Sequence, residues 1–280
     1  MRSYLNLGCG QRFRRGWTNV DFVMGDPSVM AHDLRQGIPF EDGRFDVVYH
    51  SHLLEHFSKA RAQLFLKECW RVLKPGGTLR VAVPDLERMA RDYLQSLERA
   101  VEGDESWCHN YDWMMLELYD QAVREQSGGE MAAFLFQESI PNKEFVLSRT
   151  GVEAQRIIEG AERARAAEAA APRPPRGRLF RRLFRLLRDP LSGHETVIRK
   201  LLGDEYELLQ LGRFRRSGEI HLWMYDRHSL ARALCGSGFR NPRRVGPAES
   251  RVPNWAGYNL DTEADGTVYK PDSLYMEALK

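Results

Sequence analysis

Apolar and polar positions alternate in short runs over the first 90 residues, with one longer helical stretch between them. Four of these runs predict β-strands: residues 3–8, 17–23, 45–51 and 78–85. The third run has consecutive apolar positions at Val47, Val48 and Tyr49, which is typical of a strand buried on both faces. Strands that alternate with helices in this way predict a parallel sheet with right-handed crossovers.

Residues 58–77 repeat apolar positions every three to four residues, which is the spacing of one helix face. Ser58 stands where an N-cap would begin this helix, and "KPGG" at 74–77 is expected to end it. The positions expected on its buried face are Leu64, Leu66, Cys69, Val72 and Leu73.

The alternation stops near residue 90 and resumes after residue 217. Helical patterns occupy the interval at 90–103, 111–126, 152–170 and 178–189. A further helix is predicted at 228–239, ended by Gly236 and Gly238, and a last strand at 273–280. We therefore expect an α/β domain built from 1–90 and 218–280, with a mainly helical insertion at 91–217.

The amino-acid composition indicates the broad class of protein. Apolar residues make up 42% and charged residues 29% of the 280, which is ordinary for a soluble protein. The four cysteines show no CxxC spacing, so we interpret them as reduced thiols of a cytosolic protein. The first residues contain no apolar signal core, and no apolar run approaches the ~20 residues of a membrane-spanning helix.

The turn "LNLGCG" at residues 5–10 is the first candidate binding element. Gly8 and Gly10 leave bare backbone at the end of a strand, where either a ligand or an ordinary tight turn would explain them. The dinucleotide fingerprint is incomplete because position 13 is Phe, and no Gly-Lys-Ser/Thr follows.

Two carboxylates strengthen the ligand interpretation. Asp21 ends the second strand, where a nucleotide site places an acceptor for the ribose hydroxyls. Asp33 precedes Leu34, a pair that offers an acceptor for an adenine amino group and an apolar surface for its ring. The simpler alternatives are a solvated strand end for Asp21 and a helix N-cap for Asp33.

The order of these motifs resembles the class I S-adenosylmethionine-dependent methyltransferases. The resemblance rests on "LNLGCG", "NVD", "HDL", "FDVVYHSHLLEHF" and "ECWRVLKPGGTLRVAVPD". It covers residues 3–85, and 218–280 look like the last helix and hairpin of that fold. The layout is similar to that of bacterial methyltransferases found among genes for surface glycans.

The resemblance implies a Rossmann-like fold and S-adenosylmethionine as cofactor. Its methionyl part would lie over Gly8, Cys9 and Gly10, with Asp21 at the ribose, Asp33 and Leu34 at the adenine, and Ser51 near the amino-acid end. Asn6 stands where the family usually has an acidic residue, so it would contact the methionyl ammonium only indirectly. The crossover from Gly10 to Asp21 has room for hardly one helical turn. Cofactor affinity would therefore depend in part on contacts from the insertion at 91–217.

The segment "HSHLLEH" gathers His50, His52, Glu55 and His56. It suggests the HxHxDH motif of binuclear metal hydrolases, but it is one residue too long, and HExxH is absent. We therefore expect no metal and interpret His56 as a structural cap of the turn.

Methyl transfer to a hydroxyl requires a group that accepts the hydroxyl proton. The candidate catalytic residues are His52, Asp85 at the end of the fourth predicted strand, and His221 in "GEIHLWMYD". Asp85 is equally well explained as a helix N-cap, and His221 as a packed strand histidine.

Two stretches of the insertion indicate partners. Residues 111–121 combine aromatic and acidic side chains, which suit either a sugar acceptor or an amphipathic core helix. Residues 178–188 place arginines around a Leu/Phe face, which is typical of a helix on an anionic membrane, although a core helix with a basic rim is as consistent. Nucleic acid is disfavoured because the rest of the chain has no basic excess.

Together these patterns predict a cytoplasmic enzyme, peripheral to the inner face of the membrane, that O-methylates a sugar hydroxyl of a glycan or glycolipid intermediate. The alternatives are a small-molecule methyltransferase of secondary metabolism, a non-catalytic cofactor-binding module, and a metal-dependent hydrolase using "HSHLLEH".

Overall fold

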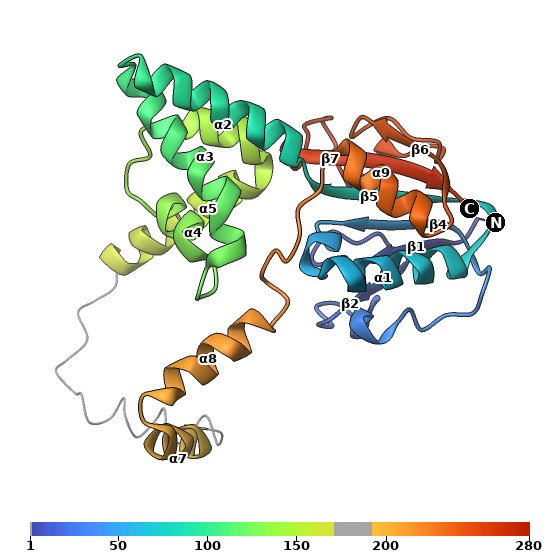
Figure 1. The fold of residues 1–280 in the computed structure, drawn as a ribbon, viewed down its shortest axis with the longest axis horizontal. Helices are drawn as coiled ribbons and strands as arrows, with labels where there is room; N and C mark the ends of the chain where they lie inside the picture. The colour runs from blue at the N-terminus through green and yellow to red at the C-terminus, as the bar shows by residue number, and fades with distance from the viewer. Residues whose placement is uncertain (1, 171–191) are drawn as a thin grey trace.

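A seven-stranded sheet forms the centre of the computed structural model, which describes residues 2–170 and 192–280. Its strands are β1 (Tyr4–Leu7), β2 (Thr18–Asp21), β3 (Val29–Ala31), β4 (Phe45–Ser51), β5 (Leu73–Pro84), β6 (Arg240–Val245) and β7 (Ser273–Leu279). The spatial order is β3-β2-β1-β4-β5-β7-β6. Strands β1 to β5 are parallel, and β7 runs antiparallel to both β5 and β6 (Figure 1). The predicted α/β class and Rossmann-like sheet are confirmed.

Two helices cover one face of this sheet: α1 (Lys59–Val72) and α9 (Arg227–Gly236). The side chain of Ser58 accepts a hydrogen bond from the Arg61 amide, so the predicted N-cap is present. Leu64 does not lie on the buried face, because its side chain is 63% exposed and Phe65 is buried instead. The apolar spacing alone does not distinguish these two neighbouring positions.

The segment "KPGG" belongs to β5 rather than to a turn between helix and strand. Helix α1 ends at Val72, and β5 begins at the next residue. A Cβ atom at Gly77 would lie 2.9 Å from the Lys74 carbonyl oxygen and 3.1 Å from that of Asp46. The glycine therefore permits the close approach of β5 to the start of β4.

The second face of the sheet is covered by residues 246–270, which contain only the short 3-10 helix η3 (Ala256–Tyr258). No helix forms between β1 and β2, as the short crossover predicts. Aromatic residues occupy this face, and the rings of Tyr4 and Trp17 stack at 4.7 Å with Trp255 against them. A parallel sheet needs both faces covered, and this segment provides the second cover.

A buried ion cluster attaches that segment to the sheet. Arg80 on β5 is fully buried and lies 2.8 Å from an Asp261 carboxylate oxygen and 3.1 Å from a Glu277 carboxylate oxygen. Its guanidinium also donates to the backbone carbonyls of Gly246 and Glu249. One side chain therefore holds the covering segment at its start and again at Asp261.

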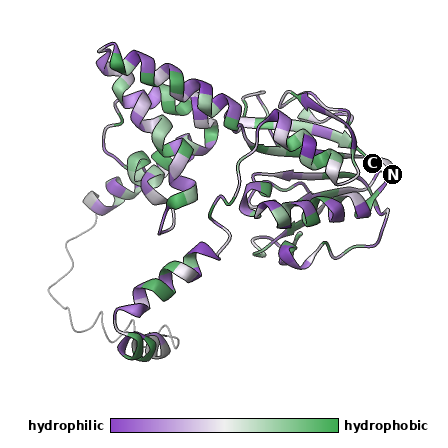
Figure 2. Cartoon of the chain, in the orientation of Figure 1, coloured by the Kyte–Doolittle hydropathy of each residue, from purple (hydrophilic) through white to green (hydrophobic). Residues whose placement is uncertain are grey.

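The first four helices after β5 pack beside the sheet around a core of their own. They are α2 (Leu86–Val101), α3 (Glu105–Val123), α4 (Gly129–Leu135) and α5 (Lys143–Ala170). Met89, Trp113, Met114 and Val146 are among the buried residues of this core. Figure 1 shows the four helices grouped at one end of the sheet, and Figure 2 shows their mixed apolar and polar faces.

The predicted helices of this region are present with different bounds. Helix α3 begins earlier than the predicted 111, and α5 begins at Lys143 rather than at 152. Helix α5 is interrupted at Gly151, whose φ of 63° is not helical. Helices α7 (Ser192–Leu202) and α8 (Glu205–Arg215) and strands β3 and β6 were not predicted. Strand β6 reads "RNPRRV", which has no apolar alternation because it is an edge strand.

The basic stretch 178–188 lies outside the described residues, so its helix stays a prediction. Among the helices of 2–170 and 192–280, none is both long and apolar enough to cross a membrane.

Candidate cofactor and acceptor site

The glycine turn after β1 lies against the end of β2. Gly8 and Gly10 have φ angles of 63° and 50°, a region that favours glycine. The Gly10 amide donates to the Asp21 carboxylate at 2.7 Å. A Cβ atom on Gly8 would lie 2.9 Å from Leu53 Cδ1. The turn therefore presents backbone, and Asp21 holds it in place.

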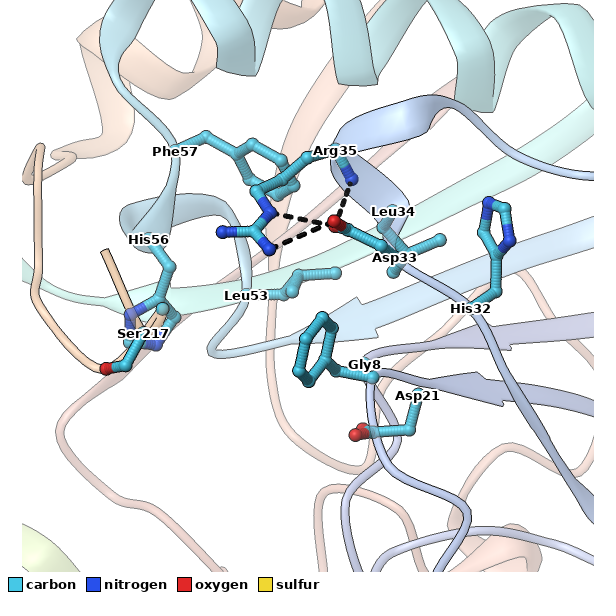
Figure 3. Close-up of a pocket in the computed structure, with 12 residues that line it drawn as sticks. Gly8, Asp21, His32, Asp33, Leu34, Arg35, Leu53, His56, Phe57 and Ser217 are labelled. Carbon is cyan, nitrogen blue, oxygen red and sulfur yellow. Dashed lines mark hydrogen bonds and ion pairs between the residues drawn. The ribbon is translucent and has the colours of Figure 1, made fainter. Parts of the chain in front are cut away.

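A cavity of about 160 Å³ opens beside this turn (Figure 3). Four of the predicted cofactor residues line it: Gly8, Asp21, Asp33 and Leu34. The figure shows Asp21 beside Gly8 at the floor of the view and Leu53 between the turn and Asp33. Phe57 and Phe22 add apolar lining. Carboxylates and apolar faces thus meet in one space, as a nucleoside requires.

Asp33 lines the cavity and also contacts Arg35. Its carboxylate accepts from the Arg35 amide at 3.0 Å, which caps the 3-10 helix η1 (Leu34–Gln36). The Arg35 guanidinium lies 2.8 Å from the same oxygen, and these hydrogen bonds, against the effect of burial, lower the pKa of Asp33 to about 2. The two interpretations of Asp33 are therefore compatible: it caps a helix and offers a charged acceptor to the cavity.

A second cavity of about 320 Å³ lies on the other side of Gly8, which lines both. The other predicted residues that line it are Asn6, Cys9, Gly10, Ser51 and His52. The strand ends of β1 and β4 carry them, since parallel strands place their carboxyl ends at one edge of the sheet.

Asn6 and Cys9 are both buried in the protein at the glycine turn. Asn6 is 1% exposed and its side-chain amide donates to the Arg12 carbonyl at 3.0 Å, so it holds the turn from below. Burial, together with the charge of Asp21, raises the pKa of the Cys9 thiol to about 12. Cys9 is therefore a neutral thiol and not a nucleophile.

His52 lies in a position that a base would need. Its backbone φ of 49° turns the chain after β4 and places the ring in the lining of the second cavity. Nε2 lies 2.8 Å from Ser273 Oγ, and Nδ1 lies 3.3 Å from Glu55 Oε1. Because a carboxylate can only accept, we assign the hydrogen to Nδ1, and the Nε2 lone pair then accepts from the Ser273 hydroxyl.

The other two candidate bases do not line either cavity. The Asp85 carboxylate accepts from the Arg88 amide at 3.2 Å, as the N-cap of α2, and lies 3.1 Å from Arg244. His221 is buried, and burial lowers its pKa to about 3 despite the nearby Glu55 charge. The N-cap interpretation of Asp85 is consistent with these contacts, whereas His221 is packed as expected but lies in no strand.

Several lining residues of the second cavity were not predicted. Glu153 comes from α5, directly after the break at Gly151, and its carboxylate lies 2.8 Å from the Lys270 ammonium. Tyr269 stacks under Arg12, whose guanidinium is 3.8 Å from the ring centroid. These residues are far apart along the chain, and no local pattern connects them.

A protein-family model for a methyltransferase domain matches residues 5–81. The matched segment is therefore similar to a methyltransferase domain over about a quarter of the chain. No curated protein matches the chain. The segment contains the glycine turn, the carboxylates Asp21 and Asp33, and His52.

Solved structures similar to the chain include three with partial likeness. The PH0226 protein of Pyrococcus horikoshii is 25% identical over 32% of this chain and 52% of its own, with a TM-score of 0.28. The 1,6-didemethyltoxoflavin-N1-methyltransferase of Burkholderia thailandensis, solved with its substrate and S-adenosylhomocysteine, is 21% identical over 30% and 45%, with a TM-score of 0.26. A SAM-dependent methyltransferase of Archaeoglobus fulgidus is 12% identical over 100% and 86%, with a TM-score of 0.37.

The chain covers about half of the first of these structures, 52% of its length. All three TM-scores are below 0.5, so the match of the methyltransferase domain is the comparison on which the function rests.

Proposed function

We propose that the protein transfers the methyl group of S-adenosylmethionine to a sugar hydroxyl. Residues 1–90 and 218–280 would bind the cofactor, and 91–217 would cover the acceptor. The observation that carries this proposal is Gly8, which lines both cavities and has no space for a Cβ atom. Gly8 therefore has no side chain at the point where the first, nucleoside-like cavity meets the second, polar cavity. This arrangement fits a ligand that spans both cavities.

The cofactor residues divide between the cavities. Asp21 would hold the ribose, and Asp33 with Leu34 the adenine. The turn at 8–10 and Ser51 would contact the methionyl part, with Asn6 acting through the turn that it supports. S-adenosylmethionine supplies an activated methyl group when bound, so positioning of the acceptor is the protein's main task.

The polar lining of the second cavity supports a hydroxyl-rich acceptor. Glu153 and Lys270 provide charged partners, and Tyr49 and Tyr269 provide aromatic surface. Sugars present hydroxyl edges and C–H faces that such a lining can bind.

His52 is the group placed to accept the hydroxyl proton. Because His52 lines the second cavity, an acceptor hydroxyl bound there would compete with Ser273 Oγ for the Nε2 lone pair. The Nδ1–H faces Glu55, whose charge stabilises the imidazolium that forms. The proton of the hydroxyl would thus move to His52 as the new O–C bond forms.

Calorimetry with S-adenosylhomocysteine and an assay of its production from a panel of sugars test this function together. Wild type is expected to bind one equivalent. His52→Ala should keep that affinity and lose about 10²–10⁴-fold in kcat, because the imidazole acts on the acceptor and not on the cofactor. The exposed His228 lies on α9, and His228→Ala should change neither quantity.

Absence of S-adenosylhomocysteine binding to wild type would overturn the methyl transfer itself. Turnover with planar aromatic acceptors and none of the sugars would overturn the acceptor class. Wild-type kcat in His52→Ala would overturn the role of His52 as base, and catalysis would then rest on positioning of the acceptor alone.

We further propose that the enzyme works in the cytoplasm, at the inner face of the membrane. The support is the sequence of residues 178–188, where arginines flank a Leu/Phe face. Co-sedimentation with anionic vesicles should occur at low salt and weaken as salt rises, because exposed charges are screened over about 8–10 Å at physiological ionic strength. Failure to co-sediment at low salt would remove this part of the proposal.

A further inference from the structure

A buried carboxylate whose polar neighbours are imidazoles lies beside the second cavity. Glu55, in the 3-10 helix η2 (Leu54–His56), is 0% exposed. No contact to its carboxylate oxygens has full hydrogen-bond geometry among the described residues, and His52 Nδ1 lies 3.3 Å from Oε1. Removing a charged carboxylate from water is costly unless a counter-charge is bound to it. A cation bound at Glu55 would supply that counter-charge directly.

Three imidazoles surround Glu55. His221 Nε2 lies 4.0 Å from Glu55 Oε1, and His52 Nδ1 lies 3.3 Å from the same oxygen. Ligand atoms of Glu55, His56 and His221 all lie within 4.8 Å of one another. Two imidazoles and one carboxylate are the protein ligands of a common type of zinc site. Atoms around one tetrahedral zinc are about 3.3 Å apart, so the three groups would close by roughly 1 Å on binding.

The contacts behind these ligands hold them in the required form. His56 Nδ1 lies 3.2 Å from the Ile220 carbonyl oxygen. A carbonyl can only accept, so Nδ1 carries the hydrogen and Nε2 keeps its lone pair for a metal. A metal-binding histidine usually has this arrangement, with its other nitrogen donating to a carbonyl or carboxylate.

The backbone also joins the two segments that carry the ligands. The amides of Leu222 and Trp223 both donate to the Glu55 carbonyl, at 2.7 and 3.2 Å. His221 is thereby held next to Glu55 although it is distant along the chain. A site assembled by main-chain hydrogen bonds before a metal arrives would bind with little rearrangement.

We propose that Glu55, His56 and His221 bind a divalent transition-metal cation of the zinc type. Nitrogen and carboxylate ligands favour zinc, cobalt or iron over magnesium or calcium, which prefer oxygen ligands. This differs from the sequence expectation of no metal. The sequence motif contains only two of the ligands, and the third comes from the segment before α9. The metal site shares Glu55 with the proposed His52 base, and His56 lines the first cavity, but the binding test below needs neither cofactor nor acceptor.

Cobalt(II) absorbance and zinc calorimetry on chelator-treated full-length protein test the site without any cofactor. Wild type should bind one equivalent of either metal, with visible cobalt bands of a four- or five-coordinate site. Glu55→Gln keeps the shape and removes the charge, and His56→Gln changes a half-buried ligand. Both should weaken zinc binding at least about 100-fold, and His221→Ala should do the same.

His109→Ala is the matched control, because His109 is exposed on α3, and it should bind metal as wild type does. Circular dichroism checks that each variant is folded, and if His221→Ala unfolds, Glu55→Gln and His56→Gln decide. No cobalt or zinc binding by wild type would overturn the proposal. Wild-type affinity in both folded Gln variants would overturn it as well.

Discussion

Gly8→Val is expected to abolish S-adenosylhomocysteine binding while the sheet stays folded. The added Cβ would lie 2.9 Å from Leu53 Cδ1, and the larger side chain would stand at a position that lines both cavities. A ligand that passes over the turn would meet these atoms directly. We expect affinity to fall at least about 100-fold, which corresponds to ~2.7 kcal/mol.

Strain at positive φ has to be separated from this blockage. Valine at the φ of Gly8 costs about 1–3 kcal/mol in any protein. Gly16 also has a positive φ, 88°, but a Cβ there meets no atom within 4 Å and it lines neither cavity. Gly16→Val should therefore show the loss of stability due to backbone strain alone, with unchanged affinity. Calorimetry and thermal unfolding of both variants give the comparison, and equal affinity of Gly8→Val and wild type would refute the cofactor assignment.

Arg80→Ala is expected to destabilise the protein by about 3–5 kcal/mol, which is the cost of breaking a buried ion pair from one side. Asp261 and Glu277 would keep their charges in a space without water, since both are almost fully buried. The covering segment 246–270 would also lose its attachment to β5. Urea unfolding followed by tryptophan fluorescence measures the loss, because Trp255 packs against the guanidinium.

Arg91→Ala is the matched control. Arg91 forms an ion pair with Glu87 on the surface of α2 and its side chain is 72% exposed. An exposed pair contributes about 0.2–1 kcal/mol at most, so the unfolding free energy should change little. A loss in Arg80→Ala no larger than that of Arg91→Ala would contradict the role of the cluster.

The buried cluster of Arg80, Asp261 and Glu277 also makes the stability of the protein depend on pH. Burial alone would raise the pKa of Glu277, but hydrogen bonds from Ser250, the Arg251 amide and Arg80 lower it below its usual 4.5. A lowered folded-state pKa contributes stability that is complete above the unfolded value and is lost as pH falls through the folded one. The contribution of Glu277 should therefore disappear only below about pH 4.5.

The sequence predicted the parts of the fold whose causes are local. Alternating apolar runs identified β1, β2 and β4, and the N-cap at Ser58 and the glycines after α9 marked helix ends. The turn at Gly8 and the carboxylates Asp21 and Asp33 could be placed together because parallel strands end at one edge.

What the sequence did not predict depends on contacts between distant segments. Strand β6 has a polar sequence, since an edge strand needs no apolar alternation, and Glu153 reaches its cavity only because α5 breaks at Gly151. A Cβ at Gly151 would lie 2.7 Å from the Tyr269 carbonyl oxygen, a contact that no pattern within α5 reveals. The contact between Glu55 and His221 likewise joins segments that are distant along the chain.

The cover formed by residues 246–270 has a consequence for the order in which the chain acquires its structure during synthesis. Arg12, just after the glycine turn, donates to the carbonyls of Asn259 and Thr262, which the ribosome adds 247 and 250 residues after Arg12. Strand β7 follows these residues in the chain and enters the sheet between β5 and β6. One face of the N-terminal strands therefore stays open until this segment has been made, and closure of such distant contacts is slow. Nascent chains that stop before residue 246 should be dependent on chaperones, although every residue of the glycine turn has already been made.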